Sequence, residues 1–224
     1  MAQIIYVGKL GQAKGQTLFC AHLATILSEQ KKCALIDFQP QNHLLEMFVA
    51  KRHHFNLKEK QNLPVPTYLA YHKNIVSESL KDYDFLVLDS SDRSLIKDAD
   101  IVLTLVSDPA LALELSKKES EISNVLWNAK KERAASGKSA FKHVLIPTAS
   151  FDMQTTEKLL KSAQKMGYML APVLEDNPSY TKGLKDGVCV LDKNLPYFKN
   201  VFDETDFFAR RNLKQILEFI FADK

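Results

Sequence analysis

The residues of this chain that are best placed to do chemistry lie between positions 8 and 17, after an apolar run and before a helical pattern. A glycine-bearing loop in such a place can surround phosphate oxygens with backbone N–H groups, while a lysine and a hydroxyl contact the phosphates and magnesium. Of the pattern G-x-x-x-x-G-K-[ST], the chain keeps Gly15 and Thr17, but it has Leu10 for the first glycine and Gln16 for the lysine. The sequence therefore predicts the scaffold of a phosphate-binding loop with altered chemistry.

The sequence around this loop resembles the ParA/MinD family of P-loop ATPases. Three ordered blocks carry the resemblance, at residues 2–24, 34–41 and 83–89, and they are similar to the family's K-G-G-V-G-K-T, D-x-D-P-Q and Y-D-x-I-I-I-D segments. Weaker similarity at residues 99–103 and 177–191 extends the resemblance over nearly the whole chain. The resemblance implies a nucleotide-binding α/β fold.

The departures from the family pattern fall on the residues that the resemblance would assign to ATP. The family's signature lysine falls on Gly11, its phosphate lysine on Gln16, and the aspartate that positions the attacking water on Gln39. Phosphoryl transfer depends on positioning and on charge stabilisation around the γ-phosphate, so these replacements predict weak or absent hydrolysis. Because one charge-assisted contact to phosphate contributes roughly 1.5–3 kcal/mol, two losses predict much weaker nucleotide binding.

An atypical active ATPase stays open as an alternative, because Lys9 and Lys14 lie in the same segment and either ammonium could contact a phosphate. If ATP binds with Mg²⁺, the metal ligands implied by the resemblance are Thr17, Asp37 and Asp89, at the carboxyl ends of strands. By the same analogy, residues 148–152 and the segment around Pro178 are candidates for the adenine pocket. The candidate nucleotide-binding residues, functional or vestigial, are Lys9, Gly11, Lys14, Gly15, Gln16 and Thr17.

Apolar runs alternate with amphipathic helical patterns along the chain. This alternation predicts an α/β fold with a doubly wound, mostly parallel sheet and helices on both faces. We expect a single ParA/MinD-like domain over residues 1–224, since α/β folds of this size are commonly one domain. The predicted strands are 3–7, 34–38, 85–89, 101–106, 143–147 and 168–171, the clearest helices 17–30 and 155–166, and the surface excursions 51–66 and 128–142.

The C-terminal segment 207–221 has a broad apolar stripe, at positions 207, 208, 213, 216, 217, 220 and 221. A stripe of this width normally faces a core, so we expect the last helix of the fold to pack on the sheet. The alternative is a membrane-targeting helix of the kind that some MinD-type proteins carry.

Composition is that of an ordinary globular protein, with 46% hydrophobic and 25% charged residues. No apolar run approaches the length of a membrane span, and the N-terminus lacks a secretory signal, so we expect a cytoplasmic protein. Cys20, Cys33 and Cys189 are widely separated in apolar patterns and are predicted to be buried free thiols. His53 and His54 have no spaced partner ligands, so no zinc site is expected.

A net charge of +3 and a pI of about 8.6 do not indicate nucleic-acid binding by themselves. Two local clusters are more suggestive, because the resemblance implies nonspecific DNA binding through phosphates. The candidate DNA-binding residues are Lys130, Lys131 and Arg133 in one cluster and Arg210, Arg211 and Lys214 in the other.

These observations favour a ParA/MinD-like protein with a degenerate phosphate loop. Its expected role is that of a partner-binding module in plasmid partition, DNA transfer or subcellular positioning, with a protein partner or adaptor. Relatives form dimers closed over two ATP molecules, and Gly11 cannot supply the lysine contact that crosses to the partner's nucleotide. Any homodimer is therefore expected to be indifferent to ATP. A nucleotide-independent DNA-binding module is the remaining alternative.

Overall fold

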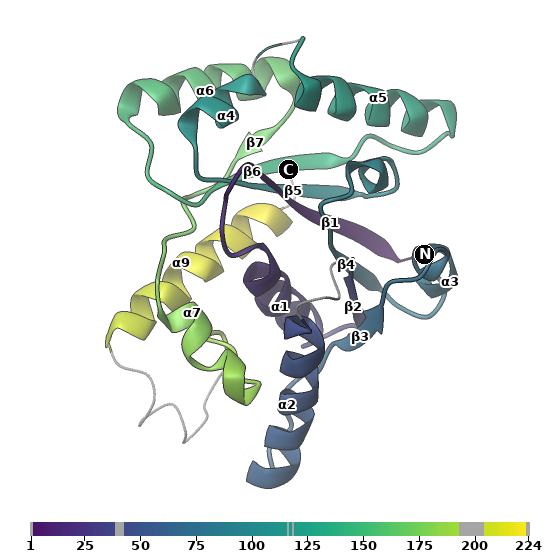
Figure 1. Cartoon of the computed structure of the whole chain (residues 1–224), viewed down its shortest axis with the longest axis vertical. Helices are drawn as coiled ribbons and strands as arrows, with labels where there is room; N and C mark the ends of the chain where they lie inside the picture. The colour runs from purple at the N-terminus through teal and green to yellow at the C-terminus, as the bar shows by residue number, and fades with distance from the viewer. Residues whose placement is uncertain (1, 39–42, 116, 118, 193–203, 223–224) are drawn as a thin grey trace.

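The computed structural model of the chain describes residues 2–38, 43–115, 117, 119–192 and 204–222, and its centre is a seven-stranded sheet (Figure 1). The strand order is β3-β2-β4-β1-β5-β6-β7, and every neighbouring pair is parallel. The predicted α/β fold with a mostly parallel sheet is thus confirmed. The strands are β1 (Gln3–Leu10), β2 (Cys33–Asp37), β3 (Thr67–Ala70), β4 (Phe85–Asp89), β5 (Ile101–Val106), β6 (Lys142–Pro147) and β7 (Met169–Leu170).

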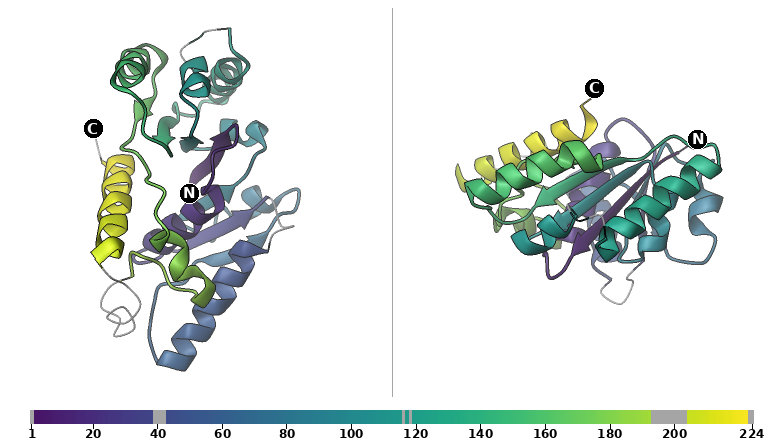
Figure 2. Two further views of the ribbon diagram at one scale, coloured as in Figure 1. Left: turned by 60° about the vertical axis from the view of Figure 1, so that its left-hand side comes forward. Right: turned by 90° about the horizontal axis from the view of Figure 1, so that it is seen from above.

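Helices cover both faces of the sheet, as Figure 2 shows from two further directions. Each face has its own buried hydrophobic cluster. One face is covered by α1 (Gln16–Leu27), α2 (Leu44–Glu59), α7 (Ser179–Lys182), η3 (Leu184–Asp186) and α9 (Glu204–Phe221). The other is covered by α3 (Ile75–Ser79), η2 (Arg93–Lys97), α4 (Pro109–Glu114), α5 (Glu121–Ala135) and α6 (Met153–Met166).

The central strand β1 is apolar and buried from Ile4 to Val7, as expected of a strand covered on both faces. Its register sets Val7 beside Asp89 of β4 and Leu10 beside Val106 of β5. Since all strands are parallel, the carboxyl ends of β1, β4 and β5 meet at one edge of the sheet. The loop after β1 and the start of α1 lie at that edge, where ligands bind in open α/β sheets.

Two predicted surface excursions are helical instead. Most of segment 51–66 belongs to α2, which buries Arg52 and Phe55, and segment 128–142 begins with the second half of α5, which buries Arg133. Both helices carry many charged residues on their exposed sides, and these masked the helical pattern. The sequence also failed to predict β3, a four-residue edge strand whose side chains are exposed or half-buried.

The C-terminal helix α9 packs on the sheet as expected, with Leu213, Ile216, Leu217 and Ile220 buried. The stripe was predicted to begin at Phe207 and Phe208, but these rings are 63% and 60% exposed, so this part of the prediction was wrong. In the described part of the chain, no helix has both the length and the hydrophobicity to span a bilayer. The three cysteines are buried free thiols, as predicted.

A buried ion pair joins α2 to the segment after η3. Two guanidinium nitrogens of Arg52 donate to the two carboxylate oxygens of Asp192 at 2.7 and 2.6 Å, and Arg52 also donates to the carbonyls of Pro64 and Gly187. The backbone of Gly187 has a φ of +78°, and a Cβ there would lie 2.2 Å from the backbone nitrogen of Arg52. Glycine is required for this close approach.

Candidate functional site

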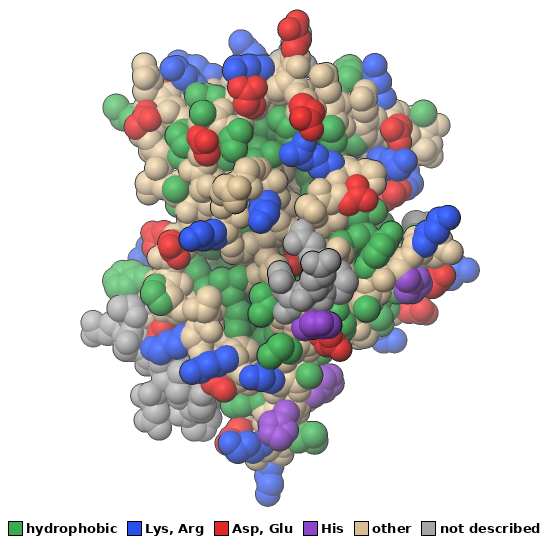
Figure 3. All heavy atoms as spheres, viewed as in Figure 1, with side chains coloured by type: hydrophobic (Ala, Val, Ile, Leu, Met, Phe, Trp, Pro, Cys, Tyr) green, Lys and Arg blue, Asp and Glu red, His purple; other side chains and the backbone are tan. Residues whose placement is uncertain are grey.

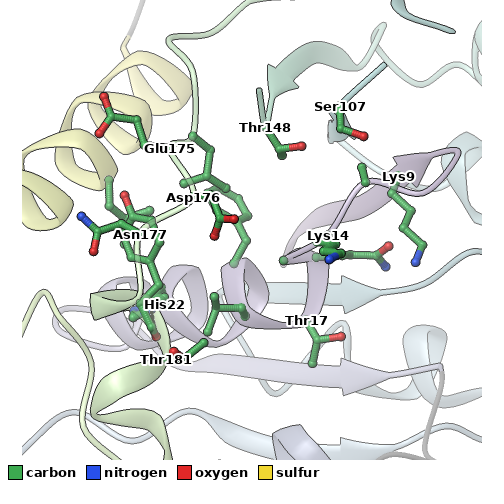
Figure 4. A pocket seen from close by; sticks show the side chains of 18 of the residues that line it. Lys9, Lys14, Thr17, His22, Ser107, Thr148, Glu175, Asp176, Asn177 and Thr181 are labelled. Atoms are coloured by element: carbon green, nitrogen blue, oxygen red, sulfur yellow. Dashed lines mark hydrogen bonds between the residues drawn. The ribbon is translucent and has the colours of Figure 1, made fainter. Parts of the chain in front are cut away.

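A cavity of about 740 Å³ opens at the carboxyl edge of the sheet, where the predicted phosphate-binding residues meet a second wall (Figure 4). The first wall is the β1–α1 segment, from Lys9 to Phe19, with His22 of α1. The second wall is segment 174–181, and Ser107 and Thr148 follow β5 and β6 between the two walls. Every nucleotide-binding candidate of the first wall except Gly11 lines this cavity.

The loop itself is shorter than predicted, because β1 continues to Leu10 rather than ending at Val7. Leu10, which replaces the first loop glycine, pairs with Val106 and has a buried side chain in the cluster beneath α4. Gly11 follows with a φ of +62°, and a Cβ there would lie 2.4 Å from Cδ1 of Leu111. The first half of the expected phosphate loop is therefore part of the sheet and its core.

Gln16, at the position of the phosphate lysine, turns its side chain into the fold. Its amide nitrogen Nε2 lies 2.5 Å from Oδ1 of Asp89, 3.1 Å from the carbonyl of Val7 and 3.3 Å from the carbonyl of Ser90. The residue is only 6% exposed, and its Oε1 has no hydrogen-bond partner among the described residues. All three neighbouring oxygens are hydrogen-bond acceptors. The amide therefore turns its nitrogen toward them, because only the nitrogen can donate.

Asp89 lies beside a second carboxylate, Asp37, which is its Cα partner on β2. Both are buried, with exposed fractions of 1% and 3%. Burial raises the pKa of Asp89, hydrogen bonds from Thr17 and Gln16 lower it, and the charge of Asp37 raises it again. The sequence-predicted magnesium candidates Thr17, Asp37 and Asp89 are thus brought together, and neutral donors already contact Asp89.

The cations of this wall are Lys9 and Lys14, and both are exposed. Burial is the main influence on the pKa of Asp89, and the charge of Lys9 lowers that pKa slightly. Gly15 has a φ of +87° and precedes α1 without a capping side chain, so the first N–H groups of the helix are left to solvent or to a ligand. Gln39, which the resemblance aligns with the family's catalytic aspartate, lies outside the described residues.

The opposite wall bears the acidic side chains Glu175 and Asp176, and Figure 4 shows Asp176 across the opening from Lys14. Thr148 and Pro178, proposed for the adenine pocket, line the cavity. Asp152 does not line it; this carboxylate accepts a hydrogen bond of 2.8 Å from the backbone N–H of Thr155 and caps α6.

Sequence reasoning missed His22, which is 2% exposed at the base of the cavity. Its Nε2 lies 3.1 Å from the carbonyl of Tyr180, whereas its Nδ1 has no partner among the described residues. Burial lowers the pKa of His22 to about 4. Nothing in the sequence marks this position, because it follows the helical period of α1 like its apolar neighbours. The described residues contain no group of three or more His, Cys, Asp or Glu side chains that could hold a metal.

The DNA-binding candidates do not form one surface. Arg133 is buried and bonded to Asp100 at 3.0 Å, and Nζ of Lys130 donates to the carbonyl of Met166 at 3.1 Å. Lys131 is exposed on α5, on one face of the sheet, while the second cluster lies on α9, on the other. On α9, Arg210 is half-buried, Arg211 is exposed, and Lys214 is exposed and pairs with Glu218 at 3.6 Å.

No protein-family model matches this chain, and no curated protein matches its sequence. Solved structures do match its fold. A MinC:MinD complex from Aquifex aeolicus has a TM-score of 0.59 at 14% identity, covering 100% of this chain and 97% of that chain. A McdA variant from Cyanothece in complex with ATP gives 0.60 at 11% identity, covering 100% and 98%. MinD from Pyrococcus horikoshii with Mg-ADP gives 0.52 at 13% identity, covering 99% and 97%.

Proposed function

We propose that this chain, which has the fold of MinD and McdA over its whole length, is a ParA/MinD-like partner-binding protein whose ATP cycle is weakened or lost. Its role would be subcellular positioning, plasmid partition or DNA transfer. The observation that carries the proposal is the contact of Gln16 with Asp89, which puts a neutral amide on the carboxylate nearest the phosphate end of the cavity.

The residues present do not fit a magnesium triphosphate. Such a ligand needs a cation on its β/γ oxygens and free carboxylate or hydroxyl oxygens for the metal. Gln16 is neutral, it points away from the cavity toward Val7 and Ser90, and Oδ1 of Asp89 is already taken. Leu10 also removes the first loop glycine, because its side chain belongs to the core.

A protein partner would then supply the function that nucleotide-driven changes supply in an ATPase. The presence of a MinC:MinD complex among the structures with this fold supports a protein partner. A homodimer of this chain, if it forms, would not respond to ATP, since Gly11 has no side chain to reach a second nucleotide and a longer residue would collide with Leu111.

The test is calorimetric titration of the full chain with Mg-ATP and with a non-hydrolysable analogue. We expect no binding heat up to millimolar ligand, and sedimentation should give the same oligomeric state with and without Mg-ATP. A second binding assay, such as fluorescence of a labelled ATP analogue, guards against binding without heat. Micromolar affinity for Mg-ATP, or a dimer that forms only with it, would overturn the proposal.

A second candidate, an atypical ATPase, is favoured by one observation, namely that Lys9 and Lys14 line the same cavity as Gly15 and Thr17. In that case Lys9 would contact the phosphates in place of the missing lysine. Phosphate release should then be measurable for the natural chain and should fall in Lys9→Ala or in Lys14→Ala. If neither substitution changes a measured turnover, neither lysine is the phosphate contact.

A further inference from the structure

The cavity at the carboxyl edge of the sheet has opposite charges on its two walls. Lys9 and Lys14 belong to the β1–α1 wall, and Glu175 and Asp176 belong to the wall of segment 174–181 (Figure 4). All four residues are exposed, and none forms an ion pair with another residue in the described part of the chain. A ligand in the cavity would therefore meet cations on one side and carboxylates on the other.

His22, at the base of the cavity, has a hydrogen-bond acceptor that lacks a donor. Burial lowers the pKa of His22 to about 4, so the ring is neutral at neutral pH. Its Nε2, 3.1 Å from the carbonyl of Tyr180, carries the proton, because a carbonyl oxygen can only accept. Nδ1 is then an acceptor, and it has no partner among the described residues. Since the ring lines the cavity, a donor group inside the cavity is what would satisfy it.

Gln16, on the β1–α1 wall, has a second acceptor of the same kind. Its amide nitrogen donates to oxygens within the fold, and its Oε1 has no partner among the residues that the structure describes. A buried acceptor without a donor is unfavourable. The two unpartnered buried atoms on residues of this cavity are thus both acceptors. A phosphate group, whose ionised oxygens are acceptors as well, would satisfy neither of them.

Apolar side chains contribute the rest of the lining. Phe19, Leu174 and Leu213 line the cavity and are buried. The volume of about 740 Å³ is that of a site for a small organic molecule, and it is far larger than a single ion requires. An apolar lining with a few polar groups on opposite walls suits a ligand that has an apolar middle and polar ends.

We propose that the cavity binds a small zwitterion, with a primary ammonium group and a carboxylate joined by an apolar chain. The ammonium would donate to Glu175 or Asp176 and to Nδ1 of His22. The carboxylate would contact Lys14 and the first N–H groups of α1, which have no capping side chain. A diamine would leave the lysine wall without a counterion, and a simple acid would leave the acceptors without a donor.

The experiment is calorimetric titration of the full chain with aminobutanoate, aminohexanoate and aminooctanoate, each with its amino group at the end opposite to the carboxylate. Because these probes differ only in chain length, affinity should be highest at the length that spans the two walls. The simple amine, the simple acid and the diamine of that length should each bind at least about tenfold more weakly, since each lacks one charge-assisted contact. Equal binding of any of the three, or no binding of any amino acid, would overturn the assignment.

The acidic wall is tested by the double variant Glu175→Gln, Asp176→Asn. It should reduce the affinity for the best amino acid at least about tenfold. The matched control is Glu59→Gln, Asp82→Asn, which removes the same charge at exposed residues that do not line the cavity. The control should keep the affinity of the natural chain. Equal losses in the two double variants would mean that overall charge, and not this wall, governs binding.

The opposite wall is tested by Lys14→Met, with Lys58→Met as its control. Lys58 lies in the last turn of α2, where Figure 3 shows charged side chains at the surface. Only Lys14→Met should weaken binding. His22→Phe removes the buried acceptor and should weaken binding too, and thermal unfolding checks that each variant is folded. If His22→Phe does not fold, the variants of the two walls decide the matter, and unchanged affinity in both contradicts the proposal.

This inference goes beyond the proposed partner-binding function and rests on it in one respect, namely that nucleotide does not fill the cavity. The two proposals fail in different ways. Micromolar affinity for Mg-ATP would overturn the proposed function whatever the amino acids do. Absence of amino acid binding, in a chain that also ignores Mg-ATP, would overturn the zwitterion site and leave the proposed function standing.

Discussion

The amide nitrogen of Gln16 lies 2.5 Å from Oδ1 of Asp89 and ties the start of α1 to the end of β4. The same nitrogen contacts the carbonyls of Val7 and Ser90, so one side chain joins three elements at the carboxyl edge of the sheet. A charged side chain that reached into the cavity could not make these contacts. The side chain of Gln16, which occupies the lysine position of the G-x-x-x-x-G-K-[ST] pattern, therefore makes contacts within the fold.

Gln16→Ala should therefore lower the stability of the protein even without any ligand. Removal of a buried donor leaves three acceptors without it, and one of them is a buried carboxylate. We expect the free energy of unfolding to fall by roughly 1–3 kcal/mol, measured by urea denaturation. Gln12→Ala, an exposed position in the same loop, is the control and should have little effect. Equal stability of the two variants would contradict the role given to Gln16.

Gly11→Ala should destabilise the chain for two reasons. The residue has a φ of +62°, which costs a residue with a Cβ about 1–2 kcal/mol, and the new methyl group would collide with Leu111. Gly137→Ala is the matched control, because Gly137 has a φ of +69° and nothing within 4 Å of a Cβ. Thermal unfolding should show a larger fall in melting temperature for Gly11→Ala than for Gly137→Ala. When both are made in a Leu111→Ala background, this excess should disappear. If the melting temperature falls no further for Gly11→Ala than for Gly137→Ala, the Leu111 side chain moves aside at no measurable cost in stability.

Acid should destabilise the protein through two buried histidines. Burial lowers the pKa of His22 to about 4 and that of His143 to about 3, from an ordinary value of 6.5. The unfolded chain takes up protons as pH falls through about 6.5, but the folded chain does not until about 4 and 3. The unfolded state thus binds more protons, and the free energy of unfolding should fall with pH across this window. The raised pKa of Asp89 acts in the opposite direction.

The variant His143→Gln tests the assignment of this acid sensitivity. It keeps a polar partner for Thr104, whose hydroxyl oxygen lies 3.1 Å from Nε2 of His143, but it cannot titrate. Urea denaturation at a series of pH values between about 4 and 7 should give a shallower decline than in the natural chain. An unchanged pH profile would place the acid sensitivity elsewhere.

Breaking the ion pair between Arg52 and Asp192 should cost far more than a surface pair. The guanidinium is fully buried, so either single variant, Arg52→Met or Asp192→Leu, leaves an uncompensated charged group in the core. We expect a loss of about 3–5 kcal/mol for Arg52→Met, and a smaller loss in the double variant Arg52→Met, Asp192→Leu. With the natural chain, the two single variants and the double variant form a double-mutant cycle, measured by urea denaturation. If the loss of stability in the double variant equals the sum of the two single losses, Arg52 and Asp192 do not stabilise each other.

Local pattern was sufficient to predict every strand of the sheet except the edge strand β3. The apolar runs at β2, β4 and β5 are buried on both sides of the sheet, so their composition alone distinguishes them from surface segments. Charged helices were harder to predict. In α2 and α5 the buried side includes Arg52 and Arg133, and a cation on the core side hides the hydrophobic period until its partner is known.

The sequence by itself determined that Leu10 and Gln16 stand where the pattern G-x-x-x-x-G-K-[ST] has its first glycine and its lysine, because residue types at fixed spacing are visible without coordinates. Only the tertiary structure decided what the replacements do. Gln16 is neutral in any conformation. Its hydrogen bond to Asp89, which is 73 positions away in the sequence, exists because β1 and β4 are neighbours in the sheet. Contacts between distant segments depend on how the strands pair, and local spacing does not contain that information.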